Sequence, residues 1–383
     1  MAFIRSKAIH QHPFSVAAWS LWFVYLRYLL NKLQHNFQRS TMVLQKILQL
    51  LMKIIYINPL LFFPVFLIYG LSRAFLLFLY LSFKTYDRKS SKERSVIPKA
   101  ITRWHQSENN HFFYKTKKTK VVLHLVTANP ELVTSDKPLM LFLHGFPECW
   151  YSWRSQLDYF GNDYKTIARK SEYSADLLLA DFDEIIEEYG NGRCILIGHD
   201  WGGALAWRYA NVYPDKVSQL IILNAPHFKA FGKILAEVPE QFLMSWYIYF
   251  FQLPYLPENC VRFRDFAVLN FLYSPLTKKA SVSSDDLDVY KYYFSKPGKL
   301  TAAINYYRAN FLSKFKSDGK ILAPTLLLWG CEDVALTEMC ANQSYLSKYV
   351  ENLTVIKNHN ASHFLQQDDP KFVNEEIYKF INV

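Results

Sequence analysis

The stretch that most constrains the fold is residues 195–203, which read ILIGHDWGG. The apolar run just before it, residues 194–197, predicts a buried strand, and the alanine-rich residues after it predict a helix. Glycines two positions before and after a central side chain allow a sharp turn between the two, and this is the sequence pattern of a nucleophile elbow. The central residue is Asp200, so the predicted nucleophile is a carboxylate.

An ionised aspartate can attack an electrophilic carbon and form an ester when the protein holds it still and partly desolvates it. The alternative is an ordinary aspartate in a strand-to-helix loop that caps the following helix. Because short motifs also match by chance, the elbow pattern at Asp200 leaves both interpretations open by itself.

Charge is distributed unevenly along the 383 residues. Residues 1–120 carry 19 Lys+Arg and 3 Asp+Glu, a net charge of +16, whereas the remaining residues carry 25 and 30, a net charge of −5. The globular part is therefore mildly acidic, so we expect no nucleic acid as a partner. The basic leader is instead suited to a membrane surface.

The leader also contains the most apolar part of the chain. Residues 54–72 carry no charge, and beyond Arg73 the apolar segment 74–81 continues the run. A helix of this length crosses a bilayer, and the alternative is a buried helix of a soluble domain. Residues 14–30 are a candidate interfacial helix or second span. We expect the lipid bilayer as a partner, a single crossing in the endoplasmic reticulum membrane, and a cytosolic C-terminal domain.

Beyond the leader, apolar strand-like runs alternate with helix-like segments, which predicts an α/β domain with a mostly parallel sheet covered by helices on both faces. After residue 226 this rhythm changes to aromatic, helix-like segments with proline breaks, which we interpret as an inserted lid. The five cysteines form no C-x-x-C pair, so we expect them to be reduced. The expected organisation is a basic segment at 1–53, a transmembrane anchor at 54–83, a solvated basic linker at 84–100, the core at 101–226 and 311–383, and the lid at 227–310.

A carboxylate nucleophile needs a base that activates water against the ester, and an acid that orients this base. Asp333 follows the predicted strand at 325–330, and His363 lies in the later segment NASHF. Glu332 is the competing acid, and a buried structural role is the alternative for His363. His359 and His363 have a spacing found in some metal pairs, but nothing nearby completes a zinc site, so we expect no metal and no cofactor.

The segment HGFP at residues 144–147 closes another predicted strand. Backbone N–H groups of Phe146 and Trp201 are positioned by this pattern to stabilise the oxygen of the ester while it carries charge. We expect His144, Pro147 and Trp201 to border the substrate, and the alternative for this segment is a simple turn.

These motifs together resemble one family. HGFPE at 144–148, WYSWR at 150–154, GHDWGG at 198–203, NAPH at 224–227 and ASHFLQQ at 361–367 are similar to the α/β-hydrolase epoxide hydrolases, and the basic leader is similar to their animal membrane-anchored branch. The resemblance extends from about residue 99 to the C-terminus and implies an α/β-hydrolase fold. It also implies that Asp200 opens the epoxide, that Asp333 orients His363, and that His363 activates the hydrolytic water.

The resemblance further implies two lid tyrosines that donate hydrogen bonds to the epoxide oxygen. Motif matching gives Tyr247 in WYIYFFQ and Tyr307 in NYYRAN, with Tyr249 and Tyr306 as the alternatives. An aromatic lid and a membrane anchor suit a lipophilic substrate, so a lipid-derived epoxide is the expected substrate class, with detoxification as the expected context.

One departure from the family bears on activity. After residue 168 the family carries a segment of the type D-x-R-G-x-G-x-S near the oxyanion hole, and this chain lacks about a dozen residues there. Its absence could open the site to water. Two alternatives therefore stay open beside epoxide hydrolysis: an inactive membrane-anchored binding protein, and a dehalogenase with the same aspartate-tryptophan elbow.

Overall fold

The computed structural model describes residues 59–84, 89, 91–106, 110–170, 175–311 and 319–382. The chain divides into two compact units, residues 1–57 and 58–383, and every described element belongs to the second unit. The candidate helix at 14–30 and the first residues of the expected anchor lie outside the described part.

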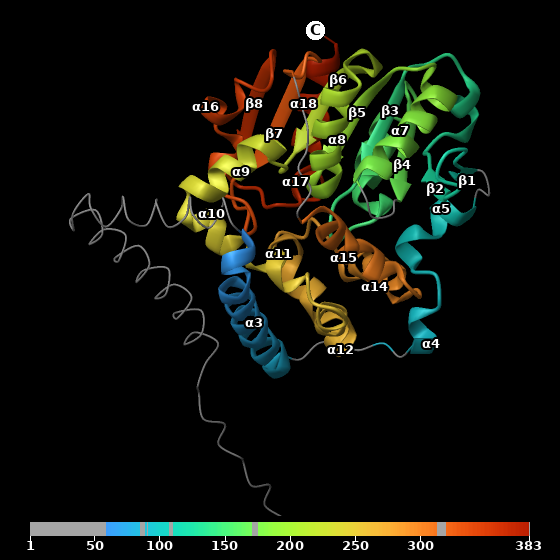
Figure 1. Cartoon of the computed structure of the whole chain (residues 1–383). Coiled ribbons are helices and arrows are strands. Elements are labelled where there is room, and N and C mark those ends of the chain that lie inside the picture. Colours follow the sequence, from blue (N-terminus) through green and yellow to red (C-terminus); the bar gives the residue numbers. More distant parts are fainter. Residues whose placement is uncertain are drawn as a thin grey trace, which may run out of the picture. The chain divides into compact units, whose positions relative to one another are not determined.

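One eight-stranded sheet forms the centre of the domain (Figure 1), in the order β1-β2-β4-β3-β5-β6-β7-β8. The pairs β1–β2 and β2–β4 are antiparallel, and the other neighbours are parallel. The strands are β1 (His111–Lys115), β2 (Val122–Val126), β3 (Leu139–Leu143), β4 (Lys165–Lys170), β5 (Cys194–His199), β6 (Val217–Leu223), β7 (Thr325–Gly330) and β8 (Leu353–Asn358).

Successive side chains of the inner strands point to opposite faces of the sheet, and this divides the hydrophobic core into two layers. Phe142, Ile197 and Leu328 face the layer that contains α6 (Arg154–Phe160) and α18 (Pro370–Ile381). Leu141, Leu196 and Leu327 face the layer that contains α7 (Ala175–Gly190) and α8 (Asp200–Val212). The predicted α/β-hydrolase fold is confirmed. The strand β8 was not predicted, because this edge strand is partly exposed along its length and only three of its six residues are apolar, without strict alternation.

Seven helices of the described chain lie between β6 and β7 and cover the end of the sheet where β5 meets α8 (Figure 1). We call them the cap. They are α9 (Phe228–Glu237), α10 (Pro239–Met244), α11 (Trp246–Phe250), α12 (Leu256–Leu272), α13 (Ser274–Lys278), α14 (Ser284–Ser295) and α15 (Lys299–Asn310). Buried cap residues such as Tyr273 and Tyr307 share one hydrophobic cluster with Trp150 and Phe364 of the core.

Preceding the core is α3 (Pro59–Phe83), whose segment Phe66–Phe83 is, among the described helices, the one that is long and apolar enough to cross a membrane. The linker after it was expected to be solvated, and this is wrong for Arg94. Its side chain is 7% exposed and forms ion pairs with Asp265 and Asp288 of the cap. Local sequence could not reveal this contact, because both partners lie more than 170 residues away. All five cysteines are free, as predicted.

The elbow depends on a close approach between α8 and β3. A Cβ atom on Gly202 would lie 2.1 Å from the carbonyl oxygen of Leu143, which is backbone and has no room to move. This approach fixes the start of α8 directly after β5, where Asp200 adopts a φ of +49°, a region that non-glycine residues rarely occupy. The strained turn therefore lifts the Asp200 side chain away from the sheet.

We expect Gly202→Ala to lower the free energy of unfolding by about 1–3 kcal/mol or more, because the added methyl group overlaps the Leu143 carbonyl. Chemical denaturation of the purified protein measures the change. Gly319→Ala is the matched control, since no atom lies within 4 Å of the position of its added Cβ. Equal stability of the two variants would contradict the assigned packing of the elbow.

Candidate active site

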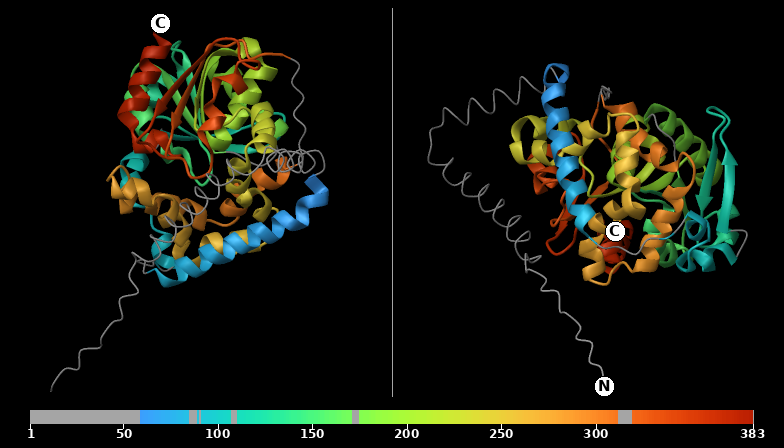
Figure 2. Two further views of the ribbon diagram at one scale, coloured as in Figure 1. Left: turned by 90° about the vertical axis from the view of Figure 1, so that its left-hand side faces the viewer. Right: turned by 90° about the horizontal axis from the view of Figure 1, so that it is seen from below.

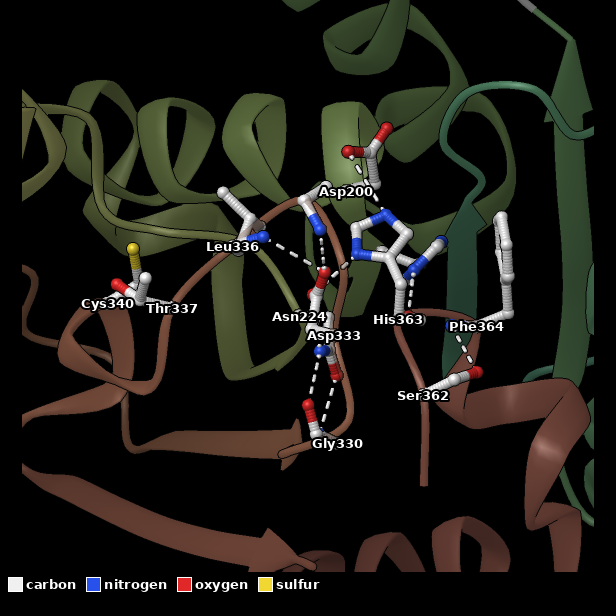
Figure 3. A network of polar contacts seen from close by, with 12 residues as sticks. Asp200, Asn224, Gly330, Asp333, Leu336, Thr337, Cys340, Ser362, His363 and Phe364 are labelled. Atoms are coloured by element: carbon white, nitrogen blue, oxygen red, sulfur yellow. Dashed lines mark hydrogen bonds and ion pairs between the residues drawn. The ribbon is translucent and has the colours of Figure 1, made fainter. Parts of the chain in front are cut away.

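Three predicted residues from distant parts of the chain meet beneath the cap (Figure 3). His363 Nδ1 lies 2.6 Å from Asp333 Oδ2, and His363 Nε2 lies 3.4 Å from Asp200 Oδ2. The imidazole thus bridges two carboxylates. Their side chains are largely buried, with exposed fractions of 16% for Asp200, 7% for His363 and 0% for Asp333.

Asp333 is held in place by a set of donors around it. The backbone N–H groups of Ala335 and Leu336 donate to its Oδ1 at 2.7 and 3.0 Å, and Asn224 Nδ2 donates to its Oδ2 at 2.8 Å. Asn224, at the end of β6, also accepts from the N–H of Gly330 at 2.8 Å and so ties β6 to β7. Glu332, the competing acid, points instead to Lys279, at 3.1 Å.

The two carboxylates and the imidazole determine each other's ionisation. Burial alone would raise the pKa of Asp200, but the hydrogen bond and charge of His363, together with the Phe146 N–H, hold it below its usual value. Burial opposes the charge on His363, yet Asp333 and Asp200 raise the pKa of the imidazole well above its usual value. The charge on Asp200 and the charge on His363 therefore stabilise each other.

The predicted oxyanion segment lies next to the nucleophile. The Phe146 N–H donates to Asp200 Oδ1 at 2.8 Å, and a Cβ atom on Gly145 would lie 2.4 Å from the Asp200 Cβ. Within the described residues, no hydrogen bond joins the Trp201 N–H to Asp200, since the second carboxylate oxygen faces His363. Pro147 is buried and follows a cis peptide bond.

Both predicted tyrosines come from cap helices and lie together. The rings of Tyr247 in α11 and Tyr307 in α15 are 5.8 Å apart and nearly perpendicular. Burial is the main cause that raises the pKa of each phenol above its usual value, and the charge of Asp200 is the second cause. Both tyrosines therefore keep their protons at neutral pH. Of the two alternatives, Tyr249 packs on Phe66 of α3. Tyr306 packs on Trp201 and lines a cavity beside the oxyanion segment.

Aromatic side chains surround Tyr307. Its ring contacts Phe146, Trp201 and Phe251 with centroid distances of 5.5, 5.1 and 4.9 Å. Two phenol groups therefore lie among apolar aromatic rings close to Asp200.

A buried polar pair below the site was not predicted from the sequence. Glu148 Oε2 lies 2.8 Å from His199 Nδ1, and His199 Nε2 donates to the backbone carbonyl of His363 at 2.8 Å. Glu148 Oε1 accepts from Gln366 and Gln367 at 2.9 and 2.8 Å. These contacts tie the oxyanion segment to the histidine loop. The motifs HGFPE and GHDWGG contain Glu148 and His199, but side-chain pairing across 51 residues has no local signal.

A cavity lies beside the oxyanion segment. His144, Phe146 and Trp201 line it together with Val122 of β2 and Ala303 of α15. Two of the three predicted substrate-bordering residues, His144 and Trp201, therefore face an open space, whereas Pro147 does not line it. The strand β4 before the shortened connection pairs with both β2 and β3.

His359 does not join His363 in a common site. It lies instead near Cys331 and Glu338, whose possible ligand atoms are all within 4.8 Å of one another. Lys357 forms an ion pair with Glu338 at 3.0 Å, so the ammonium group of Lys357 already partly neutralises this carboxylate.

Comparisons with a family profile, with related proteins and with solved structures agree on the fold and the family of this chain. A family profile described as alpha/beta hydrolase fold matches residues 138–370. Human epoxide hydrolase 4 is 38% identical over 296 residues, which cover 72% of this chain and 80% of that protein. Epoxide hydrolase 3 of Xenopus tropicalis is 37% identical over 313 residues, covering 75% and 82%.

Among solved structures, a Bacillus megaterium epoxide hydrolase in complex with an inhibitor is similar, with a TM-score of 0.63 and 27% sequence identity. The match covers 71% of this chain and 100% of that chain.

We expect Asp333→Asn to lower the pKa of His363, because the charge of Asp333 is the largest influence that raises it. Titration of the imidazole by NMR measures the shift. Glu332→Gln is the control, since that side chain is 52% exposed and pairs with Lys279. A pKa that stays unchanged in Asp333→Asn, or falls as much in Glu332→Gln, would contradict the assignment of Asp333 as the partner of His363.

Proposed function

Because this chain belongs to the epoxide hydrolase family of the α/β-hydrolases, we propose that it converts lipophilic epoxides to vicinal diols through an ester on Asp200. The observation that carries the proposal is the position of His363 between Asp333 and Asp200. A base that contacts the nucleophile and is oriented by a second acid is what hydrolysis of such an ester requires.

In the first step an Asp200 oxygen attacks an epoxide carbon, and the bond from that carbon to the epoxide oxygen breaks. The oxygen gains negative charge, which Tyr247 and Tyr307 stabilise as hydrogen-bond donors from the opposite side. Their raised pKa values keep the phenol protons available for this role. One phenol then gives its proton to the alkoxide.

In the second step water attacks the ester carbonyl, and His363 takes a proton from this water. Ester formation removes the charge of Asp200, one of the two charges that raise the pKa of His363. The pKa of the imidazole therefore falls when the ester forms, so His363 gives up its proton, which returns to the phenolate left by the first step. The neutral imidazole can then act as a base. The Phe146 N–H stabilises the oxyanion. The bond from the acyl carbon to the diol oxygen then breaks as this oxygen takes the proton from His363. The released Asp200 carboxyl loses its proton to His363, which restores the starting ion pair.

The expected substrate class rests on the walls of the site. Phe146, Trp201 and Phe251 around Tyr307 favour a lipophilic molecule, and the apolar helix α3 favours association with a membrane, where such molecules concentrate. A lipid-derived epoxide remains our proposed substrate. Location in the endoplasmic reticulum remains a prediction from the sequence.

A single turnover in ¹⁸O-labelled water with a long-chain alkyl epoxide tests the ester. We expect ¹⁸O in the Asp200 carboxylate and unlabelled oxygen in the first diol, because water attacks the acyl carbon. Mass analysis of the peptide that contains Asp200 detects the label, and Asp200→Ala should form no diol.

Label in the first diol instead would show direct attack of water on the epoxide and would overturn the ester mechanism. If folded protein gives neither diol nor label with several epoxides, the chain is an inactive binding protein, as the shortened connection after β4 would explain.

We expect Tyr307→Phe and Tyr247→Phe each to slow ester formation by on the order of 10²-fold, because each removes one donor to the developing alkoxide. Rapid-mixing measurement of the first turnover separates this step from hydrolysis. Tyr249→Phe is the matched control on α11, since its ring packs on Phe66 of α3. An equal effect of Tyr249→Phe would contradict the assignment of Tyr247.

A further inference from the structure

The helix α3 is packed against the cap along its length. In its first half, Phe66 contacts Phe242 and Tyr249 with centroid distances of 4.3 and 5.1 Å. At its middle, Gly70 is buried, and a Cβ atom there would lie 3.1 Å from the carbonyl oxygen of Trp246. This close approach brings α3 onto α11, the helix that contains Tyr247.

The second half of α3 is held by α12. Phe78 lies 4.4 Å from Phe263 between ring centroids. The guanidinium of Arg264 donates to the carbonyl oxygen of Leu81 at 3.0 Å and also to that of Ser82. Carbonyl groups at the end of a helix lack hydrogen-bond partners within that helix. Arg264 provides such partners at the C-terminus of α3.

The segment after α3 also contacts the cap. Arg94 is buried between Asp265 of α12 and Asp288 of α14, and Lys89 pairs with Asp288 as well. The cap therefore binds α3 at the beginning, middle and end, and it binds the segment after it.

The opposite face of α3 is exposed and apolar. Five of its exposed side chains are Ile68, Phe75, Leu76, Leu79 and Phe83, with exposed fractions from 37% to 84%. They extend over about 22 Å at the helical rise per residue. A continuous apolar strip of this size on a protein surface marks a contact with lipid or with another protein.

A crossing orientation conflicts with these contacts. A helix that spans a bilayer passes through about 30 Å of hydrocarbon, and the cap helices packed along α3 would have to enter with it. The backbone and the charged side chains of α12 would then lie in lipid, where unsatisfied polar groups are costly. Arg73, near the middle of the apolar segment, would lie close to the bilayer centre.

We propose that α3 lies flat in one leaflet of a membrane, with its exposed face among the acyl chains and the cap seated on the membrane surface. In this orientation Arg73 extends to the headgroups, as long basic side chains do at an interface. The net charge of +16 in residues 1–120 favours an anionic leaflet as the partner. Figure 2 shows α3 along the side of the cap that faces away from the sheet.

This orientation replaces the single crossing expected from the sequence, and it does not depend on epoxide hydrolysis. It fixes the helix that contains Tyr247 to the membrane through Gly70 and Trp246. The cap is then the part of the enzyme closest to the lipid.

Accessibility of the two ends of α3 tests the proposal in the full-length protein. Lys53→Cys and Lys84→Cys place a thiol before and after the helix, and a membrane-impermeant maleimide is added to sealed microsomes. We expect both thiols to react from the same side, above the background of the wild-type cysteines. Detergent then gives the total reactive thiol for each variant. Reaction from opposite sides would show a crossing helix and overturn the proposal, as would recovery of the protein in the soluble fraction.

Depth along the helix gives a second test. Ile68→Cys, Phe75→Cys and Phe83→Cys are labelled with a fluorophore in vesicles of phosphatidylcholine and phosphatidylserine that contain lipids with a nitroxide at shallow or deep positions. A flat helix gives the same depth at all three positions, whereas a crossing helix gives the greatest depth at position 75. Leu177→Cys on α7, where the native leucine is 55% exposed, is the matched control and should show no quenching. Neither test requires activity.

Discussion

The imidazole of His363 between two buried carboxylates is the interaction on which the rest of the site depends. Each of the three groups comes after a different strand, β5, β7 or β8, so only a correctly ordered sheet brings them within 3.4 Å. Burial strengthens every charge interaction in this set, and it makes the ionisation of His363 depend on whether Asp200 carries a charge. In the proposed mechanism, that dependence allows His363 first to stabilise the nucleophile and later to activate water.

The supporting contacts explain why the geometry is rigid. Asn224 joins β6 to β7 while it orients Asp333, and the pair Glu148 and His199 joins the oxyanion segment to the backbone of His363. Polar groups buried in this way stabilise one arrangement, because any shift leaves a donor or acceptor without a partner. The cap adds the phenols from the other side, and α3 in turn packs against the cap helix that carries one of them.

How well the sequence predicts a feature depends on whether the interactions behind it are local or join residues that are distant in the chain. The elbow at Asp200 is local, since small residues and an apolar strand define it within nine positions. The position of Asp333 after a late strand was also predictable, because an α/β sheet places such loops at one edge. For His363 the sequence provided its place in the chain order, but not the strand β8 that precedes it. In contrast, the burial of Arg94 arises from carboxylates that are remote in the chain, and a stretch rich in Lys, Arg and Ser is expected to be solvated.

The sequence by itself determined the fold class, the alternation of strands and helices in the core, the elbow with its carboxylate and the apolar character of α3, because each of these is encoded in neighbouring residues and their period. Tertiary structure alone decided which polar side chains pair, which of Tyr247 and Tyr249 faces the site, and where α3 lies. The physical reason is that a helix as apolar as α3 is equally suited to lipid and to a protein surface. The ring contacts of Phe66 and Phe78, the close approach at Gly70 and the capping of the helix end by Arg264 place one face of α3 on the cap.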